Sequence, residues 1–195
     1  MPGSIIPSFL FYCFINGITP GPANLTSLNA ALRYGRDAAL RQWSGLFIGF
    51  FADAMLAVFL NFFVGAALGS KVRYLSYVGA AYILWLAVHI LRSTGTSEAN
   101  AKQNCNFLTG FFVQITNVKV ILFCITALGT FVLPYTDNLR QLILAGCFLP
   151  FTGPICNLVW LFAGVYLQGI FRRHERVINI IMFIALILCA LNLLR

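Results

Sequence analysis

The sequence predicts an all-α integral membrane protein, with six transmembrane helices arranged as two inverted three-helix repeats. Three observations support this fold class: the composition, a series of long apolar stretches, and an internal repeat. Of the 195 residues, 60% are hydrophobic and only 9% are charged, and the mean hydropathy is +0.86. The surface of a soluble domain needs far more charge than this. The composition therefore excludes an ordinary soluble protein.

Six apolar stretches are long enough to cross a bilayer. A spanning helix needs about 20 mostly apolar residues. The stretches that meet this requirement cover residues 5–32, 43–66, 74–91, 107–133, 139–168 and 176–194. The longest polar connection, residues 92–106, is too short and too polar to form a core of its own. We therefore expect residues 1–195 to form a single transmembrane domain.

An internal repeat divides the chain into two halves. "ITPGPANL" at residues 18–25 resembles "ITNVKVIL" at residues 115–122. This match predicts one repeat over about 1–92 and a second over about 107–195, joined by a cytoplasmic linker at about 93–106. Three spans in each half would make the second half run opposite to the first, an inverted repeat. The alternative is chance, because apolar segments often resemble one another.

The basic residues predict the orientation of the chain. The formal net charge is +8, but the Lys and Arg residues occupy short loops between apolar helices, which argues against a nucleic-acid partner. Cytoplasmic loops carry the excess of Lys and Arg. Eight basic residues fall on one side and four on the other, which places both termini in the periplasm. The eight are Arg33, Arg36, Arg41, Arg92, Lys102, Arg172, Arg173 and Arg176.

The first apolar stretch contains Pro20, Gly21 and Pro22, and these residues predict a break in the first helix. Proline removes a helical hydrogen bond, and lipid offers nothing to replace it. A break would create two half-helix ends, with carbonyl groups near Asn16 and N–H groups near Asn24. These ends have opposite partial charges and match the ammonium and carboxylate of an amino acid. The alternative is a kink that serves packing only.

Several residues that are energetically unfavourable in lipid lie near the middle of the membrane. Pro20, Asp53, Lys119 and the Gly153-Pro154 pair all fall near the centres of predicted spans. The Lys119 stem is too short to carry its ammonium to water from this depth, which predicts a cavity rather than snorkelling. Asp53 either forms an ion pair with Lys119 or carries a proton, because a carboxylate in low dielectric binds protons readily.

Other polar residues are weaker candidates, and no cofactor or metal is expected. These polar side chains either line the cavity or form hydrogen bonds that join one helix to another. His89 and His174 have no metal-like neighbours, and the sequence has no phosphate-binding loop or hydrolase motif. We therefore expect neither an enzyme nor an ATP-driven pump, and we interpret Trp85 and Trp160 as packing residues. The candidate cavity-lining residues are Asn16, Gln114, Thr116, Pro154 and Asn157.

Four motifs resemble the LysE/RhtB family of amino-acid exporters over essentially the whole chain: "TPGPANL" (19–25), "GLFIG" (45–49), "NVKVILF" (117–123) and "FVLP" (131–134). Segments 79–87, 117–134 and 157–164 look most like the cysteine/O-acetylserine exporters of this family. The resemblance implies a secondary transporter of small neutral amino acids in the bacterial inner membrane, working by proton antiport, with a homodimer as the family habit. It carries over six residues as substrate-binding or gating positions: Thr19, Pro20, Gly21, Pro22, Asn117 and Lys119.

The chain departs from the family pattern at two places. Pro154 in the fifth stretch predicts a break there like the one at Pro20. The other departure concerns the proton site. Many members have an acidic residue directly after the second glycine of a G-x-x-x-G motif, and this chain has Phe50 there. Asp53 lies nearly one turn later on the same helix face, so it either takes over that role or leaves the proton site elsewhere. Alternative functions are a homoserine/threonine-type or other exporter of the family, a passive channel, or a membrane scaffold.

Overall fold

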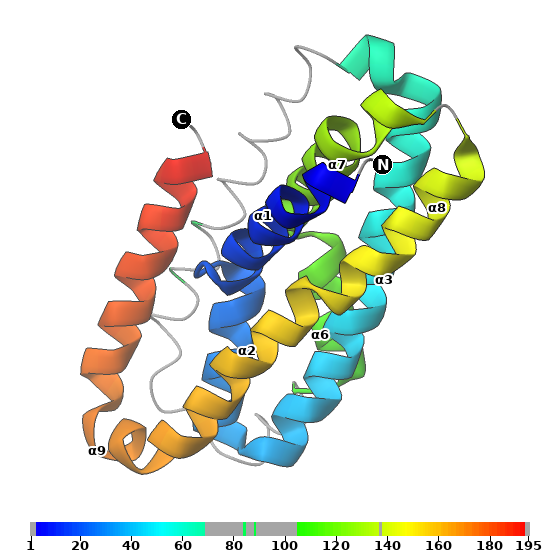
Figure 1. Cartoon of the computed structure of the whole chain (residues 1–195). Helices are drawn as coiled ribbons and strands as arrows, with labels where there is room; N and C mark the ends of the chain where they lie inside the picture. The colour runs from blue at the N-terminus through cyan, green and yellow to red at the C-terminus, as the bar shows by residue number, and fades with distance from the viewer. Residues whose placement is uncertain (1–2, 69–83, 85–87, 89–104, 137, 194–195) are drawn as a thin grey trace.

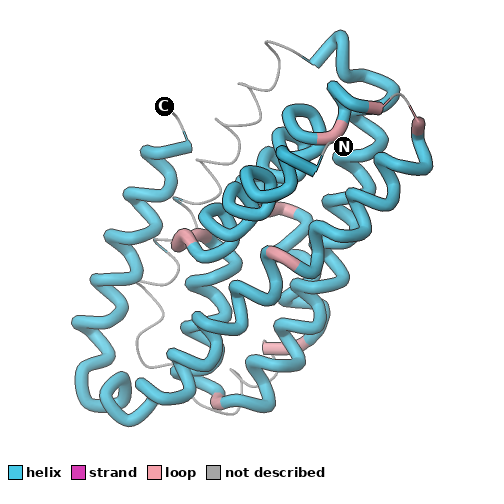
Figure 2. Tube along the Cα trace, in the orientation of Figure 1, coloured by secondary structure: helices cyan, strands magenta, loops and turns pink. Residues whose placement is uncertain are grey.

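The computed structural model is a bundle of long helices (Figure 1). It describes residues 3–68, 84, 88, 105–136 and 138–193, and every element in this part of the chain is helical (Figure 2). The predicted third span (74–91), apart from Leu84 and Val88, lies outside the described residues, as does the predicted linker before Cys105. The arrangement of six spans as inverted repeats therefore stays a prediction.

The predicted break in the first span is confirmed. A short turn, η1 (Gly3–Ile5), leads into α1 (Ile6–Ile18), and α2 (Pro22–Tyr34) follows at a bend of 47°. Thr19 is extended, with φ −62° and ψ 132°, because a residue before proline avoids the helical region. Pro22 then begins α2 at a position where its missing N–H costs nothing. Local sequence thus both ends α1 and starts α2.

The second span is one unbroken helix, α3 (Arg36–Leu68). Gly35 connects it to α2 with φ of 79°, a left-handed conformation that favours glycine. Asp37 lies in the first turn of α3, where its charge complements the helix dipole. The helix begins seven residues before the predicted start at 43, because its first two turns extend the apolar stretch with polar residues.

The fourth span is broken, although the sequence predicts one continuous helix over 107–133. It consists of α6 (Phe107–Ile115) and α7 (Val118–Phe131), followed by the short turn η3 (Leu133–Tyr135). Asn117 interrupts it with φ −81° and ψ 87°. The break matches the repeat, since α1 ends at Ile18 and α6 at Ile115, equivalent positions in the two repeat segments. Lys119 consequently lies in the first turn of α7, beside the break, and not in mid-helix.

The fifth span is also interrupted, as Pro154 suggests. It contains α8 (Leu139–Phe148), the turn η4 (Leu149–Phe151) and the start of α9 (Gly153–Leu193). The α9 backbone leaves the helical region at His174, with φ −129° and ψ 35°, and Figure 1 shows the chain reversing direction there. The part of α9 after this kink covers the predicted sixth span.

The described helices have the lengths and surfaces of a multi-pass membrane protein. Three are long and apolar enough to cross a bilayer, and the bent α1–α2 pair passes the same test of length and composition when its two helices are taken as one span. Large apolar side chains remain on the surface, including Phe11, Phe63 and Ile181, which are 67%, 62% and 59% exposed. A soluble monomer rarely exposes so much apolar area, whereas lipid covers it at no cost. The bundle therefore presents a lipid-facing surface.

The interior of the bundle forms where α3 packs against α6 and α7, and where α2 and α1 pack against α9. Phe123 lies at the centre of the main core, stacking on Tyr12 at 5.6 Å and meeting Phe50 edge-on at 6.2 Å between ring centroids. The α3–α6 crossing is closest at Gly45 and Gly110, where backbone approaches backbone. This packing holds the three helix breaks in the middle of the bundle (Figure 2).

Candidate functional site

The broken end of α1 is completed by side chains from three other helices. The last carbonyl groups of a helix have no partner within it, and inside a membrane they need partners from the protein. Asn24 Nδ2 in α2 donates to the carbonyls of Gly17 (2.8 Å) and Thr19 (2.9 Å). Trp160 Nε1 in α9 donates to the carbonyl of Ile18 at 3.0 Å. The break is therefore a specifically built feature, and not merely a kink.

Lys119 in α7 is the third of these partners. Its Nζ donates to the carbonyl of Thr19 at 3.0 Å and to that of Asn16 at 3.4 Å. The negative end of the α1 dipole thus receives a full positive charge, which is a favourable arrangement. The lysine stem passes so close to Gly21 that a Cβ there would lie 3.0 Å from Lys119 Cδ and 3.1 Å from Nζ. Glycine at position 21 leaves room for this crossing.

Asn24 also begins a buried chain of polar side chains. Its Oδ1 accepts from Asn157 Nδ2 at 2.8 Å, and Asn157 Oδ1 accepts from Ser27 Oγ at 2.8 Å. All three residues are buried. Because each amide has its donor and acceptor in use, this chain fixes the orientation of Asn24 and ties α2 to α9. The first turn of α2 is thereby held rigidly beside the end of α1.

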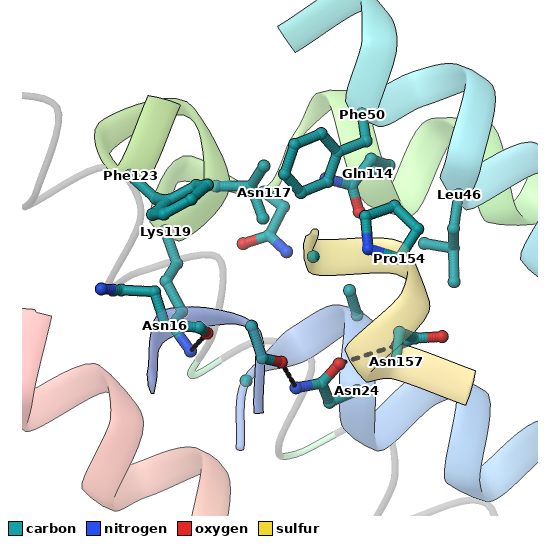
Figure 3. A pocket seen from close by; sticks show the side chains of 15 residues that line it. Asn16, Asn24, Leu46, Phe50, Gln114, Asn117, Lys119, Phe123, Pro154 and Asn157 are labelled. Carbon is teal, nitrogen blue, oxygen red and sulfur yellow. Dashed lines mark hydrogen bonds between the residues drawn. The ribbon is translucent and has the colours of Figure 1, made fainter. Parts of the chain in front are cut away.

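A cavity lies where the broken helices meet (Figure 3). It encloses about 40 Å³ open to a water-sized molecule, which is room for about three waters. Its polar residues are Asn16, Asn24, Gln114, Asn117, Lys119 and Asn157, and its other lining residues are Gly17, Gly21, Ala23, Leu46, Phe50, Val120, Phe123, Gly153 and Pro154. The space open to a water-sized molecule is smaller than an amino acid, with amides on one part of the cavity wall and large apolar side chains on another.

One polar atom at the cavity has no partner. Asn117 is 1% exposed, and its Oδ1 lacks any hydrogen-bond partner among the described residues. Figure 3 shows its amide between Lys119 and Pro154, pointing into the cavity. A buried acceptor without a partner costs about 1–3 kcal/mol. Such an atom in a cavity is typical of a site that binds a ligand with N–H or O–H donors.

Comparison with known families identifies the type of protein. Residues 14–195 match the family described as LysE type translocator. The chain belongs to the LysE family of translocators. It is 36% identical over 193 residues to a protein of Salmonella typhi named cysteine/O-acetylserine efflux protein, and 34% identical over 193 residues to a protein of Escherichia coli O157:H7 with the same name. Each alignment covers 99% of this chain and 99% of the relative. No solved structure matches the chain.

This LysE translocator is a transporter and not an enzyme, and its cavity contains most of the residues that the sequence singles out. Eight line the cavity: Asn16, Gly21, Asn24, Gln114, Asn117, Lys119, Pro154 and Asn157. Thr19 contributes its backbone carbonyl. Pro20 and Pro22 set the backbone of the break without lining the cavity. Thr116 lies apart, since its hydroxyl is exposed and donates to the carbonyl of Phe112 in its own helix.

Asp53 does not line the cavity of this LysE translocator, but it forms a hydrogen bond with a residue that does. It is 2% exposed, and its Oδ2 accepts a hydrogen bond from Gln114 Nε2 at 3.2 Å. Gln114 itself lines the cavity. Of the two interpretations of Asp53, the ion pair with Lys119 loses support, because each side chain has a different partner: Gln114 for Asp53, and the carbonyls of α1 for Lys119.

Sequence reasoning missed two polar residues of the site. Trp160 is interpreted from sequence as a packing residue, but its indole N–H completes the end of α1. Ser27 supplies the last donor of the buried amide chain. An available signal is the need of a buried indole N–H for an acceptor. The apolar wall formed by Leu46, Phe50 and Phe123 gives no sequence signal, because such residues occur throughout every span.

Proposed function

We propose that this chain exports small neutral amino acids, with cysteine and O-acetylserine as the first candidates, across the bacterial inner membrane by proton antiport. The relatives named as cysteine/O-acetylserine efflux proteins support this substrate class. The observation that carries the site assignment is the unpartnered Asn117 Oδ1 at a cavity between half-helix ends. An ammonium donates to such an oxygen, and the first turn of α2 offers N–H groups to a carboxylate.

Transport through this cavity requires it to open, since it holds only about three waters in this state. A narrow cavity between broken helices in the middle of the bundle fits alternating access, in which the site opens to one side at a time. A passive channel would instead need a continuous polar path. The apolar wall faces the amides across the cavity, so it provides a place for a short uncharged side chain such as that of cysteine or O-acetylserine.

The proposed orientation places both termini in the periplasm. Figure 1 shows the N-terminus at the end of the bundle opposite to the α2–α3 connection and the α9 reversal. Arginines gather near those two connections, as expected for a cytoplasmic side. Those with described side chains are Arg33, Arg36, Arg41, Arg173 and Arg176, whereas Arg140 lies in the first turn of α8 at the other end of the bundle (Figure 1). A homodimer, which the family resemblance implies, stays a prediction.

Efflux measurements with an Asn117→Leu variant test the proposed function. The substitution removes a buried unpartnered acceptor, so the protein should be as stable as wild type or more stable. Efflux should fall at least about tenfold, because a hydrogen bond to a charged group contributes about 1.5–3 kcal/mol. Thr116→Val, next in the chain but outside the cavity, is the control and should transport normally. The measurement is efflux of radiolabelled cysteine and O-acetylserine from preloaded cells at equal membrane expression.

Wild-type efflux no faster than that of cells with an empty vector would reject these two substrates. The same assay would then be repeated with homoserine and threonine, which other exporters of the family take. Normal efflux by Asn117→Leu would instead reject the cavity as the transport site.

Proton coupling is proposed to depend on Asp53. Asp53→Asn keeps an oxygen for the Gln114 hydrogen bond but removes the group that binds a proton. We expect exchange of labelled for unlabelled substrate in proteoliposomes to continue, and accumulation driven by a pH gradient to be lost. Asp37→Asn, an exposed acid in the first turn of the same helix, is the control. Gradient-driven accumulation by Asp53→Asn at the wild-type level would place the coupling group elsewhere.

A further inference from the structure

The position of Lys119 is not explained by its own helix. It lies in the first turn of α7, where the helix dipole is positive and disfavours a cation. The side chain leaves this turn and reaches the end of α1, which is 100 residues away in the sequence at Thr19. Glycine at position 21 gives this path room, because a Cβ there would lie 3.0 Å from the lysine stem. The ammonium is therefore directed to α1 by the packing around it.

Lys119 is also partly redundant as a structural partner of α1. The Thr19 carbonyl accepts from Asn24 Nδ2 at 2.9 Å as well as from Lys119 Nζ at 3.0 Å. The second lysine bond, to the Asn16 carbonyl, is long at 3.4 Å, which indicates a weak bond. If Lys119 moved away, Asn24 would still satisfy Thr19. The Thr19 carbonyl would therefore keep a donor if the lysine ammonium moved.

The ammonium of an amino acid has the same chemistry as that of Lys119, with one positive charge and three N–H donors. We propose that Lys119 occupies the place of the substrate ammonium in the empty cavity and exchanges positions with it on binding. The substrate carboxylate draws the lysine away, and the substrate ammonium takes over the carbonyls of Asn16 and Thr19. Asn117 Oδ1, which has no partner among the described residues, is the third acceptor. This inference rests on the proposed function and assigns the orientation of its substrate.

The exchange sets a requirement on the ligand. A molecule with an ammonium but no carboxylate meets the charge of Lys119 and cannot displace it. A zwitterion has both groups: its carboxylate draws the lysine away, and its ammonium takes the place of the lysine ammonium. Wild-type protein should therefore bind amino acids but not simple alkylammonium ions, and loss of the lysine should open the site to such ions.

Thermal unfolding of the purified protein with propylammonium tests the exchange. Lys119→Ala removes a three-carbon chain and its ammonium, which propylammonium replaces. At ten times its Kd, propylammonium should raise the Tm of Lys119→Ala by about 3 °C or more. It should leave wild type unchanged and also Arg140→Ala, which removes an exposed cation. Neutral propanol should have no effect. Lys119→Gln, which keeps a donor without the charge, provides a second variant if alanine prevents folding.

Competition with cysteine distinguishes exchange from a purely structural ammonium. Cysteine should stabilise wild type, and propylammonium should weaken cysteine binding to the Lys119 variants at least tenfold. If cysteine stabilises wild type but propylammonium does not compete with it in the variants, this inference fails and the proposed function stands. An absence of any propylammonium effect on both variants overturns the inference in the same way. If cysteine stabilises no protein, the inference and the substrate assignment fail together.

Discussion

The Asn24→Asp substitution is expected to lower the free energy of unfolding by about 3–5 kcal/mol. Asn24 Nδ2 donates to the carbonyls of Gly17 and Thr19, and aspartate of the same size offers only acceptor oxygens there. The Gly17 carbonyl loses its donor, the Thr19 carbonyl keeps only Lys119, and both face a negative charge in a site that is 6% exposed. The hydrogen bond from Asn157 can persist, so the loss reports specifically on the end of α1.

Asn29→Asp is the matched control on the same helix. The Asn29 side chain accepts from Arg33 Nε at 2.9 Å, and aspartate keeps that acceptor and adds an opposite charge. We expect no loss of stability, or a small gain. Unfolding in mixed micelles, followed by circular dichroism, measures both variants. Equal losses for the two substitutions would contradict the special role of Asn24 at the helix break.

The Gly110→Ala substitution is expected to destabilise the protein by about 3 kcal/mol or more. Its Cβ would overlap the carbonyl oxygen of Gln42 and lie 3.0 Å from the backbone nitrogen of Leu46. The obstacle is the backbone of α3, which no side-chain rotation relieves, so α3 and α6 must move apart. Overpacking of a well-packed interior costs about 1–3 kcal/mol when side chains yield, and here they cannot.

Gly169→Ala is the control for Gly110→Ala. Gly169 lies in α9, and a Cβ there would meet nothing within 4 Å among the described residues. Alanine should raise the free energy of unfolding by about 0.5–1 kcal/mol, because glycine is a poor helix former. The same micelle unfolding compares the two variants. A similar result for both would show that the α3–α6 crossing is looser than its geometry implies.

Two of the helix breaks could be predicted from sequence, because their residues carry the signal locally. Pro20 and Pro22 prevent a continuous helix whatever surrounds them, and Pro154 marks the break before α9. Asn117 carries no such signal, since asparagine can remain helical. Its break depends on packing between the two halves of the chain. Only the alignment of residues 115–122 with residues 18–25 indicates it, through the equivalence of Ile115 and Ile18.

The residues that belong to the site could be predicted better than the hydrogen bonds between them. Depth in the membrane is readable from sequence, so Pro20, Lys119 and Asp53 are found as costly residues at one level. Their partners are not readable in the same way. Lys119 contacts carbonyls 100 or more residues away, and a backbone carbonyl is present at every position. The sequence allows two interpretations of Asp53 for this reason, and its hydrogen bond with Gln114 emerges only from the fold.

The dependence of α1 on distant helices has a consequence for biosynthesis. The Ile18 carbonyl has no hydrogen bond from Trp160 until that residue, 142 positions later in the chain, has been synthesised. At about 5–20 residues per second, the ribosome needs on the order of 10–30 s to make that segment. During this interval α1 and α2 are already in the insertion machinery or the lipid, and the Ile18 carbonyl still lacks its hydrogen-bond donor. Nascent chains that stop before α9 should therefore be substrates for membrane proteases.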